Sequence, residues 1–226
     1  MYLCKVNNKS NYMKTEQKIW FTSDTHFTHK NIIAHCPERA SAGDFDADDI
    51  PAHDKWVIEK WNKTVGKNDI VYIIGDFSFA SSEYVKKLCG KLNGKKHLVI
   101  GNHDKSSEKL EGYFKDIKLI KCHTFKKSQF SFLDEDFQVC MCHYAMVVWP
   151  SKHYGCVQVC GHSHGRLDDY NEESTDLRVD VGWDSKLGNY GLVSLEKLYK
   201  YFKEKTKGEL FCKYAQSMKE SKEMLV

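Results

Sequence analysis

The stretch His97-Leu98-Val99-Ile100-Gly101-Asn102-His103-Asp104 joins a short apolar run to three consecutive polar side chains. The apolar run, with lysines and glycines around it, is typical of a short buried strand. A glycine at the end of a strand lets the backbone turn sharply and approach its neighbours closely. The amide, imidazole and carboxylate that follow lie where α/β proteins place their chemistry, at the end of a strand. We therefore expect a functional site at this turn.

The composition is that of a globular protein with one sizeable core. The chain has 226 residues, of which 41% are hydrophobic, 13% aromatic and 29% charged, and this length does not require a second domain. The net charge of +3 is too small to require nucleic acid as a partner. We find no apolar run near the ~20 residues of a membrane span and no apolar signal-peptide core. These features predict a cytoplasmic protein that binds no membrane.

The nine cysteines are interpreted mostly as reduced thiols, because a cytoplasmic protein seldom forms disulfides. A structural zinc site is the alternative for Cys140, Cys142, Cys156 and Cys160, since thiolates suit zinc. We favour apolar packing within strands, because neither pair has the two-residue gap of a zinc knuckle.

The first half of the chain alternates strands and helices. Strands are expected at 19–23, 70–74 and 97–100, the second of them buried on both faces. The first intervening helix is capped by Asp49 with Pro51 in its first turn, and carries apolar Trp56, Val57, Trp61 and Val65; the next starts near Ser82, with Tyr84, Val85, Leu88 and Leu92 inward. This order predicts a parallel sheet with crossover helices. Residues 36–49 are expected to form an irregular surface loop.

After Phe114 the pattern changes to short runs joined by polar turns. We expect antiparallel strands at 117–125, 128–133 and 137–142, another strand at 157–160, and closing strands at 177–181 and 190–195. An acidic loop is expected at 168–176, and a helix with a solvated tail from residue 196. The predicted organisation is a flexible arm at 1–16, one domain at 17–200, and a charged C-terminal helix or tail at 201–226.

Metal-binding side chains follow five of the expected strands. They are Asp24 with His26, Asp76, Asn102 with His103, His143, and His162 with His164. Any one of these residues alone could be a turn-forming residue or a buried histidine with its hydrogen bonds made. The requirements of packing do not explain the whole set. Imidazole suits zinc, iron and manganese, whereas carboxylate and amide oxygens suit manganese and magnesium. The set predicts two divalent transition metals that share a carboxylate.

The same motifs resemble, in order, those of the calcineurin-like metallophosphoesterase superfamily. The matching elements are Asp24-x-His26, Gly75-Asp76, Gly101-Asn102-His103-Asp104, His143 and Gly161-His162-Ser163-His164. The resemblance extends over about residues 18 to 195, and the stretch 21–33 is similar to a small branch found in bacteria and phages. It implies an α/β fold, a two-sheet β-sandwich flanked by helices, with the second sheet formed by the antiparallel half and the metals at the shared edge.

The resemblance also implies a role for each motif residue. Asp24, His26 and His164 would hold the first metal, Asn102, His143 and His162 the second, and Asp76 would bridge them. A bridging hydroxide would attack the phosphorus, His103 would protonate the leaving oxygen as general acid, and Asp104 would orient His103. The two divalent ions are expected to be Mn²⁺, with Fe, Zn, Ni or Mg as alternatives.

Other residues near the motifs are weaker candidates. His29 and Arg166 are candidate substrate-binding residues, with helix capping and a surface position as the alternatives. Five aromatic residues follow the motif positions and could form a wall of the site on which a base stacks. The alternative is that they only pack around the rim of the site. They are Phe77, Phe79, Tyr144, Trp149 and Tyr154. No role is assigned to His35, His53, His97, His123 and His153.

The predicted activity is hydrolysis of phosphodiesters, or else phosphomonoesters, with nucleotides or small diesters as the favoured substrates. Two alternatives are a nuclease for single-stranded nucleic acid and a non-catalytic, metal-binding scaffold for protein interactions. The sequence shows no long basic stripe of the kind that would favour the nuclease. A non-catalytic scaffold would have no need of His103, so the presence of this residue favours an enzyme. We expect a small phosphoester or nucleotide partner, long nucleic acid being less expected, and a monomer or homodimer.

Overall fold

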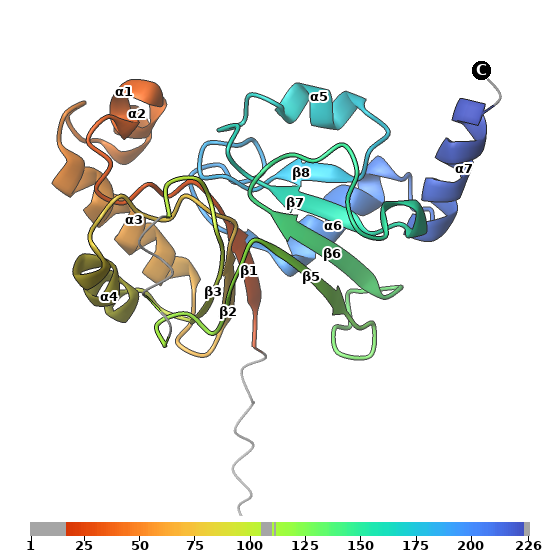
Figure 1. Ribbon diagram of the computed structural model, residues 1–226, viewed down its shortest axis with the longest axis horizontal. Helices are drawn as coiled ribbons and strands as arrows, with labels where there is room; N and C mark the ends of the chain where they lie inside the picture. The colour runs from red at the N-terminus through yellow and green to blue at the C-terminus, as the bar shows by residue number, and fades with distance from the viewer. Residues whose placement is uncertain (1–16, 105–109, 111, 224–226) are drawn as a thin grey trace, which may run out of the picture.

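The computed structural model describes residues 17–104, 110 and 112–223, so the arm predicted at 1–16 lies outside the described residues. It contains two β-sheets flanked by helices (Figure 1), as the resemblance implied. The first sheet has the order β4 (Ile117–Lys118), β3 (Lys95–Val99), β2 (Ile70–Ile73), β1 (Ile19–Thr22) and β9 (Val193–Ser194). The second has the order β5 (Ile120–Phe125), β6 (Phe137–Cys142), β7 (Val157–Cys160) and β8 (Arg178–Asp180).

The first sheet is buried on both faces. Strands β1 to β4 are parallel, and β9 pairs antiparallel with β1. Successive side chains of a strand point to opposite faces, so Val71 and Ile73 of β2 pack toward the helices while Tyr72 packs into the core between the sheets. The prediction of a doubly buried strand at 70–74 is confirmed for β2.

Four helices lie in the connections between strands of this sheet. The two larger ones pack on its outer face, and the two short ones form a separate small cluster above them (Figure 1). The two larger ones begin with the predicted caps: the Asp49 carboxylate accepts from Ala52 N–H, and the Ser81 hydroxyl accepts from Tyr84 N–H. The expectation that Tyr84 points inward is wrong, since it is 38% exposed and Cys89 is buried instead. The helices are α1 (Ile32–His35), α2 (Glu38–Gly43), α3 (Ile50–Thr64) and α4 (Ser82–Lys91).

The second sheet is mixed, which corrects the prediction of an antiparallel half. Only β5 and β6 pair antiparallel, whereas β6, β7 and β8 run parallel to one another. Short apolar runs do not reveal the direction of a neighbouring strand, and the connections after β6 and β7 are long enough for crossovers. As a result β6, β7 and β8 all end at the same edge.

Five segments differ from the sequence prediction. The expected surface loop at 36–49 contains helix α2, in which Arg39 is buried. Residues 128–133 form turns instead of a strand, and 168–176 contain helix α5 (Asp168–Glu173) instead of a loop. Two acidic residues begin α5, where they favour the positive end of a helix. Residues 117–125 divide into β4 and β5, which belong to different sheets, and the closing strand near 190–195 shrinks to β9 in the first sheet.

The C-terminal helices are part of the core. Helix α6 (Leu195–Lys205), which confirms the helix predicted from residue 196, buries Leu198 and Phe202. Helix α7 (Phe211–Glu223) buries Phe211 and lies beside the short 3₁₀ helix η2 (Lys152–Tyr154). Within the described part of the chain, no helix has both the length and the apolar character needed to cross a membrane.

The cysteines of the second sheet pack as apolar side chains. Cys140 and Cys156 form a small core cluster with Trp149, and burial raises the pKa of both thiols, to about 12 for Cys156. The eight cysteines within the described residues are free thiols. Within the described residues, no three of Cys140, Cys142, Cys156 and Cys160 form a group close enough to hold one ion, and their burial supports the packing interpretation.

Candidate metal centre

The predicted ligands converge because the parallel strands of both sheets end at one edge. Asp24, Asp76 and Asn102 follow β1, β2 and β3, whereas His143 and His162 follow β6 and β7. The two sheets are joined there by a bridge between Ser23 and Gly182. A fully antiparallel second sheet would send β6 and β7 to opposite ends, so the mixed pairing is what brings their histidines together.

Most of the predicted ligands occupy a backbone conformation that side chains rarely adopt. Their φ angles lie between 50° and 68°, in the left-handed region. Aspartate and histidine visit this region more readily than most residues, but each such residue still costs on the order of 1 kcal/mol. Strain of this kind gathers where the surrounding fold holds a functional group in place. The residues concerned are Asp24, His26, Asp76, His162 and His164.

Asp24, His26 and His164 form the first donor group. Nε2 of His26 lies 3.7 Å from Oδ1 of Asp24 and 3.2 Å from Nε2 of His164. Oδ2 of Asp24 accepts from the backbone N–H of His162, but the buried Oδ1 has no hydrogen-bond partner. An unpartnered buried carboxylate oxygen is costly unless a cation meets it. One carboxylate and two imidazoles therefore fit a divalent metal ion.

Asp76, His143 and His162 form the second donor group. Nδ1 of His143 donates to the carbonyl oxygen of Ile74 at 2.8 Å, which directs its Nε2 toward the site. That Nε2 lies 3.2 Å from Oδ1 of Asn102, so the amide adjoins the group as predicted. The mixture of imidazole, carboxylate and amide donors again fits a divalent metal ion.

The carboxylate of Asp76 lies between the two donor groups. Its Oδ2 is 3.7 Å from Nε2 of His26 and 3.4 Å from Nε2 of His143. Burial acts to raise the pKa of Asp76, but the His143 imidazole and the backbone N–H of His103 outweigh it and hold this pKa at about 2. The group is thus an anion at neutral pH, placed where one carboxylate can serve both donor groups.

Gly101 allows the close approach that the sequence indicated. A Cβ at this position would lie 2.2 Å from Oδ1 of Asp76 and 2.4 Å from its backbone nitrogen. Real Cβ atoms do not come so near, so any side chain at Gly101 would displace the carboxylate between the donor groups. The need for glycine arises here from proximity.

Asp104, which was predicted to orient the His103 ring, instead holds the backbone of the site. Its carboxylate accepts from the backbone N–H groups of Asp76, Phe77 and Gly101 at 2.8 to 2.9 Å, instead of facing the His103 ring. Burial raises the pKa of Asp104 to about 6, although these N–H groups favour its charged form. Asp104 therefore ties the turn after β2 to the turn after β3.

His103, His29 and Arg166 line a cavity of about 260 Å³ above the donor groups. The His103 side chain is 40% exposed, and its Nε2 lies 3.9 Å from Oδ2 of Asp76. The His29 ring stacks on Phe79 at 3.9 Å, and its pKa falls to about 4 because of burial and the neighbouring imidazoles. His29 is therefore neutral at pH 7. The structure thus brings every predicted site residue except Asp104 to the wall of one cavity or to the donor groups beneath it.

The predicted aromatic wall divides into two parts. Phe79 and Tyr144 are 38% and 46% exposed, and their rings contact His103 and His162 respectively. Phe77 and Trp149 are buried in separate core clusters. Tyr154, the fifth predicted member, contacts His153 and does not line this cavity. Of the five, Phe79 and Tyr144 therefore lie where a ligand at the donor groups would meet them.

Sequence reasoning missed the polar groups behind the first donor group. Nδ1 of His164 lies 2.6 Å from Oδ2 of Asp184 and 3.4 Å from Sγ of Cys36. Arg39, buried in the segment predicted as a surface loop, forks onto Asp184. Burial acts to raise the pKa of Asp184, but Arg39 and His164 hold it well below its usual range. Asp184 could have been found from the sequence, because it follows an apolar run and Gly182 as the other candidate ligands follow their strands. No feature of the sequence indicated that Arg39 would be buried at the site.

The fold and the two donor groups place the molecule among phosphoesterases that bind divalent metals. The family model for calcineurin-like phosphoesterases matches residues 17–191, and the chain belongs to this family. Membership of this family indicates that the chain is a phosphoric ester hydrolase. Members of the family bind divalent metals, in agreement with the two donor groups described above.

Individual relatives resemble only part of the chain. An uncharacterised protein of Methanocaldococcus jannaschii is 38% identical over 95 residues, which are 41% of this chain and 50% of that protein. The gene 66 protein of a mycobacteriophage is 38% identical over 88 residues, or 38% of this chain and 39% of the phage protein. The chain therefore spans half or less of the length of these relatives. The crystal structure of a protein of unknown function from Aquifex aeolicus has the same fold, with a TM-score of 0.57, 22% identity, and coverage of 82% of this chain and 99% of that one.

Proposed function

We propose that this chain hydrolyses phosphodiester bonds of nucleotides or small diesters, and phosphomonoesters less efficiently, at a centre of two divalent ions. The observation that carries the proposal is the Asp76 carboxylate, which lies between two donor groups with His103 beside it. Two ions, with Mn²⁺ best matched to mixed imidazole and oxygen donors, would supply positive charge to the phosphate and lower the pKa of a water nucleophile.

His103 is the proposed general acid. Its backbone N–H donates to Oδ1 of Asp76 at 3.0 Å, which anchors the residue beside the donor groups, and its ring packs 4.2 Å from that of Phe79. The partly exposed imidazole faces the cavity, where it can give a proton to the departing alkoxide. Asp104 contributes by holding the turn that carries His103.

His29 and Arg166 are the proposed phosphate-binding residues. The Arg166 guanidinium is exposed at the cavity wall, so it can reach two phosphate oxygens at once. His29, neutral because its pKa is about 4, can hydrogen-bond to the phosphate without adding charge next to His103. Together they would orient the ester for in-line displacement.

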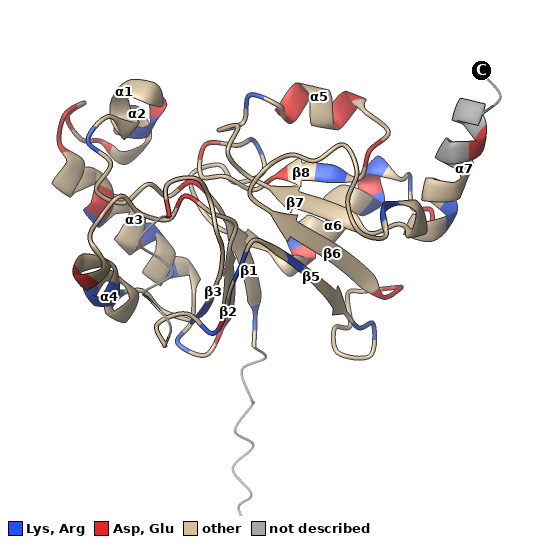
Figure 2. Ribbon diagram, viewed as in Figure 1, with Lys and Arg blue, Asp and Glu red and all other residues tan. Residues whose placement is uncertain are grey.

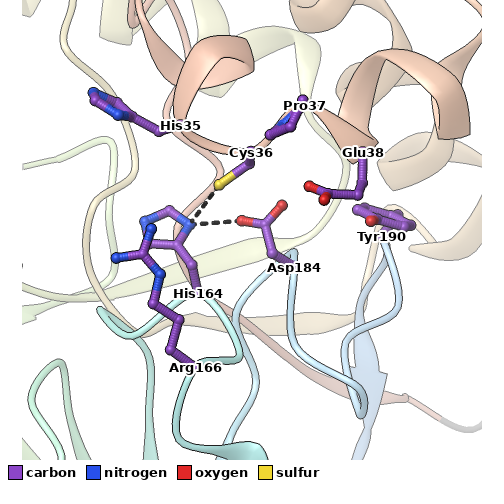
Figure 3. A pocket seen from close by; sticks show the side chains of 8 residues that line it. All are labelled: His35, Cys36, Pro37, Glu38, His164, Arg166, Asp184 and Tyr190. Carbon is purple, nitrogen blue, oxygen red and sulfur yellow. Dashed lines mark hydrogen bonds and ion pairs between the residues drawn. The ribbon is translucent and has the colours of Figure 1, made fainter.

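A neighbouring cavity favours diesters over monoesters. It has a volume of about 380 Å³, shares His35, Cys36, His164 and Arg166 with the first cavity, and ends at Glu38 and Tyr190 (Figure 3). A diester carries a second substituent, and this space can take it. The Tyr190 ring suits stacking with a base, and the Glu38 carboxylate can accept hydrogen bonds from hydroxyl groups.

The distribution of charge favours a small substrate over long nucleic acid. Lys and Arg segments alternate with Asp and Glu segments over both halves of the molecule (Figure 2). Proteins that follow a nucleic-acid backbone usually present a continuous basic stripe. The alternating pattern supports a compact diester as the substrate.

The activity is tested with bis-p-nitrophenyl phosphate and p-nitrophenyl phosphate, each with Mn²⁺ and after chelation. We expect turnover of both with Mn²⁺, a higher kcat/KM for the diester, and loss of both rates on chelation. No turnover of either ester with Mn²⁺, Fe²⁺, Zn²⁺, Ni²⁺ or Mg²⁺ would contradict the proposal.

The preference for diesters is tested with Tyr190→Ala. Loss of a stacking contact worth ~1.4 kcal/mol should raise KM for the diester about tenfold and leave the monoester within twofold. Tyr154→Ala is the matched control, because Tyr154 is 65% exposed and lies outside the cavity. Equal effects of Tyr190→Ala on both esters would show that the second cavity does not select diesters.

A further inference from the structure

Arg39 is a fully buried guanidinium beside the first donor group. Its Nε and Nη2 donate to the two oxygens of Asp184 at 2.7 and 2.6 Å. Nη2 also donates to the carbonyl oxygen of Asp24 at 2.7 Å, and Nη1 reaches the carbonyl oxygen of Thr25 at 3.3 Å. Nη1 lies 3.0 Å from Nε2 of His53 as well. Arg39 thus contacts the main chain of one predicted ligand directly.

Asp184 connects Arg39 to a second ligand. Its Oδ2 accepts from Nδ1 of His164 at 2.6 Å, a contact drawn in Figure 3. A hydrogen bond at Nδ1 sets the tautomer and the orientation of the ring, and it leaves Nε2 as the donor atom. That Nε2 faces the first donor group, 3.2 Å from Nε2 of His26 and 3.9 Å from Oδ1 of Asp24.

The grouping of Cys36, His164 and Asp184 also has the composition of a metal site. A third ion there would lie next to the guanidinium of Arg39, which already engages both oxygens of Asp184. Two cations at such a distance in a buried position repel each other strongly. The contacts of this grouping therefore favour support of the His164 ring over binding of another ion.

Packing alone does not explain where these contacts go. Burying an arginine is costly unless a partner compensates its charge, and Asp184 provides that compensation. The remaining guanidinium contacts go to the carbonyl oxygens of Asp24 and Thr25, next to the donor group, and to the ring of His53. Asp24 has a φ angle of 57°, so the fold holds it in a strained conformation at the point that Arg39 contacts.

We propose that Arg39 and Asp184 are positioning residues of the first donor group, which set the orientation of His164 and the turn of Asp24 for metal binding. The inference rests on the proposed function only in requiring that this group binds a metal. Asp184 also lines the second cavity, so the readout that tests this role is Mn²⁺ affinity and not KM for the diester. The second donor group has its own supports, in the Ile74 carbonyl and Asp104.

The test is a titration of the chelator-treated full chain with Mn²⁺, with free Mn²⁺ followed by electron paramagnetic resonance. The unmodified chain should bind two ions. Asp184→Asn, which keeps the size of the side chain but removes its charge, should weaken one of the two sites 10- to 100-fold and leave the other within twofold. Arg39→Lys should weaken the same site, because lysine cannot fork onto the carboxylate. Excess Mn²⁺ should restore kcat in both variants.

Arg178→Lys is the matched control. Arg178 is also a buried arginine, but it bonds to Asn171 and the Met146 carbonyl, away from both donor groups. The Arg178→Lys variant should lower the melting temperature as Arg39→Lys does, and it should keep both Mn²⁺ sites intact. The inference is overturned if Asp184→Asn and Arg39→Lys bind both ions like the unmodified chain, or if Arg178→Lys loses a site equally. An unmodified chain that binds no Mn²⁺ would overturn the two-metal proposal itself, and this inference with it.

Discussion

In the first donor group the outer support comes from ionised side chains, whereas in the second it comes mainly from the main chain. His164 is held by Asp184, which is itself held by Arg39 from a segment 145 residues away in sequence. His143 is held by the carbonyl oxygen of Ile74, and the turn of Asp76 by a carboxylate that accepts backbone N–H groups. The two groups thus share donor chemistry but differ in what orients them.

This difference has a physical cause in the sheets. Ile74 and Gly101 directly follow β2 and β3, so their backbone groups reach the site wherever those strands form. Both donor groups take residues from both sheets, but His143 directly follows β6 and reaches the carbonyl at the end of β2. His164 instead lies four residues after β7, in a loop, and its partner is the Asp184 side chain. A charge pair can join such separate segments, but it requires residues to arrive from elsewhere in the chain and to be buried together.

Asp76→Asn is expected to have the largest effect, because it removes the carboxylate that the two donor groups share. Both Mn²⁺ sites should weaken, and kcat/KM should fall on the order of 10³-fold, since metal ions contribute several kcal/mol to such reactions. Mn²⁺ titration and the diester assay measure the two effects. Asp69→Asn is the control, because Asp69 is buried among Lys18, Trp20 and Gly66, away from both groups. Loss of one site alone would assign Asp76 to a single group.

His103→Ala is expected to separate chemistry from metal binding. Both Mn²⁺ sites should stay within twofold, while kcat falls about 10²- to 10⁴-fold for substrates with poor leaving groups. The decrease should be smaller for p-nitrophenyl esters, whose leaving group needs little protonation. A comparison of p-nitrophenyl and alkyl diesters measures this dependence. If a Mn²⁺ site were lost as well, His103 would belong to the second donor group.

Two glycine substitutions are expected to affect one donor group each, with smaller effects. A Cβ at Gly161 would lie 2.4 Å from Oδ2 of Asp24, whereas a Cβ at Gly75 would lie 2.4 Å from Nδ1 of His143. Gly161→Ala should therefore weaken the first site and Gly75→Ala the second, each at a cost of ~1–3 kcal/mol in stability. Site-resolved Mn²⁺ affinities and melting temperatures measure both. The contrast between the groups fails if either variant weakens the two sites equally.

The candidate ligands could be located from the sequence because each lies shortly after an apolar run that forms a strand. The resemblance implied Asp24, His26 and His164 for one ion, Asn102, His143 and His162 for the other, and Asp76 between the two. The geometry brings together Asp24, His26 and His164, and separately Asp76, His143 and His162, with the Asn102 amide beside His143. The close approach expected at Gly101 is confirmed, because it depends on the residues that directly follow a strand.

The errors arose where a local pattern does not determine the structure. Residues 128–133 have apolar side chains at strand-like spacing, but Phe130 and Leu133 contribute to the core from turns. The acidic segment 168–176 forms a helix, although its composition suggested a loop. Arg39 was assigned to a surface loop because nothing in the sequence indicates that a charged residue will be buried beside Asp184.

Patterns along the chain were enough to indicate the candidate metal ligands, the strands that carry them, and the glycine that allows two turns to meet. Those properties depend on neighbours along the chain, through hydrophobic runs and turn chemistry. The parallel direction of β6, β7 and β8, and the position of Arg39 and Asp184 behind His164, emerge from the folded chain. These features depend on strand pairing and on compensation of a buried charge between segments far apart in sequence, and such partners are chosen only when the core forms.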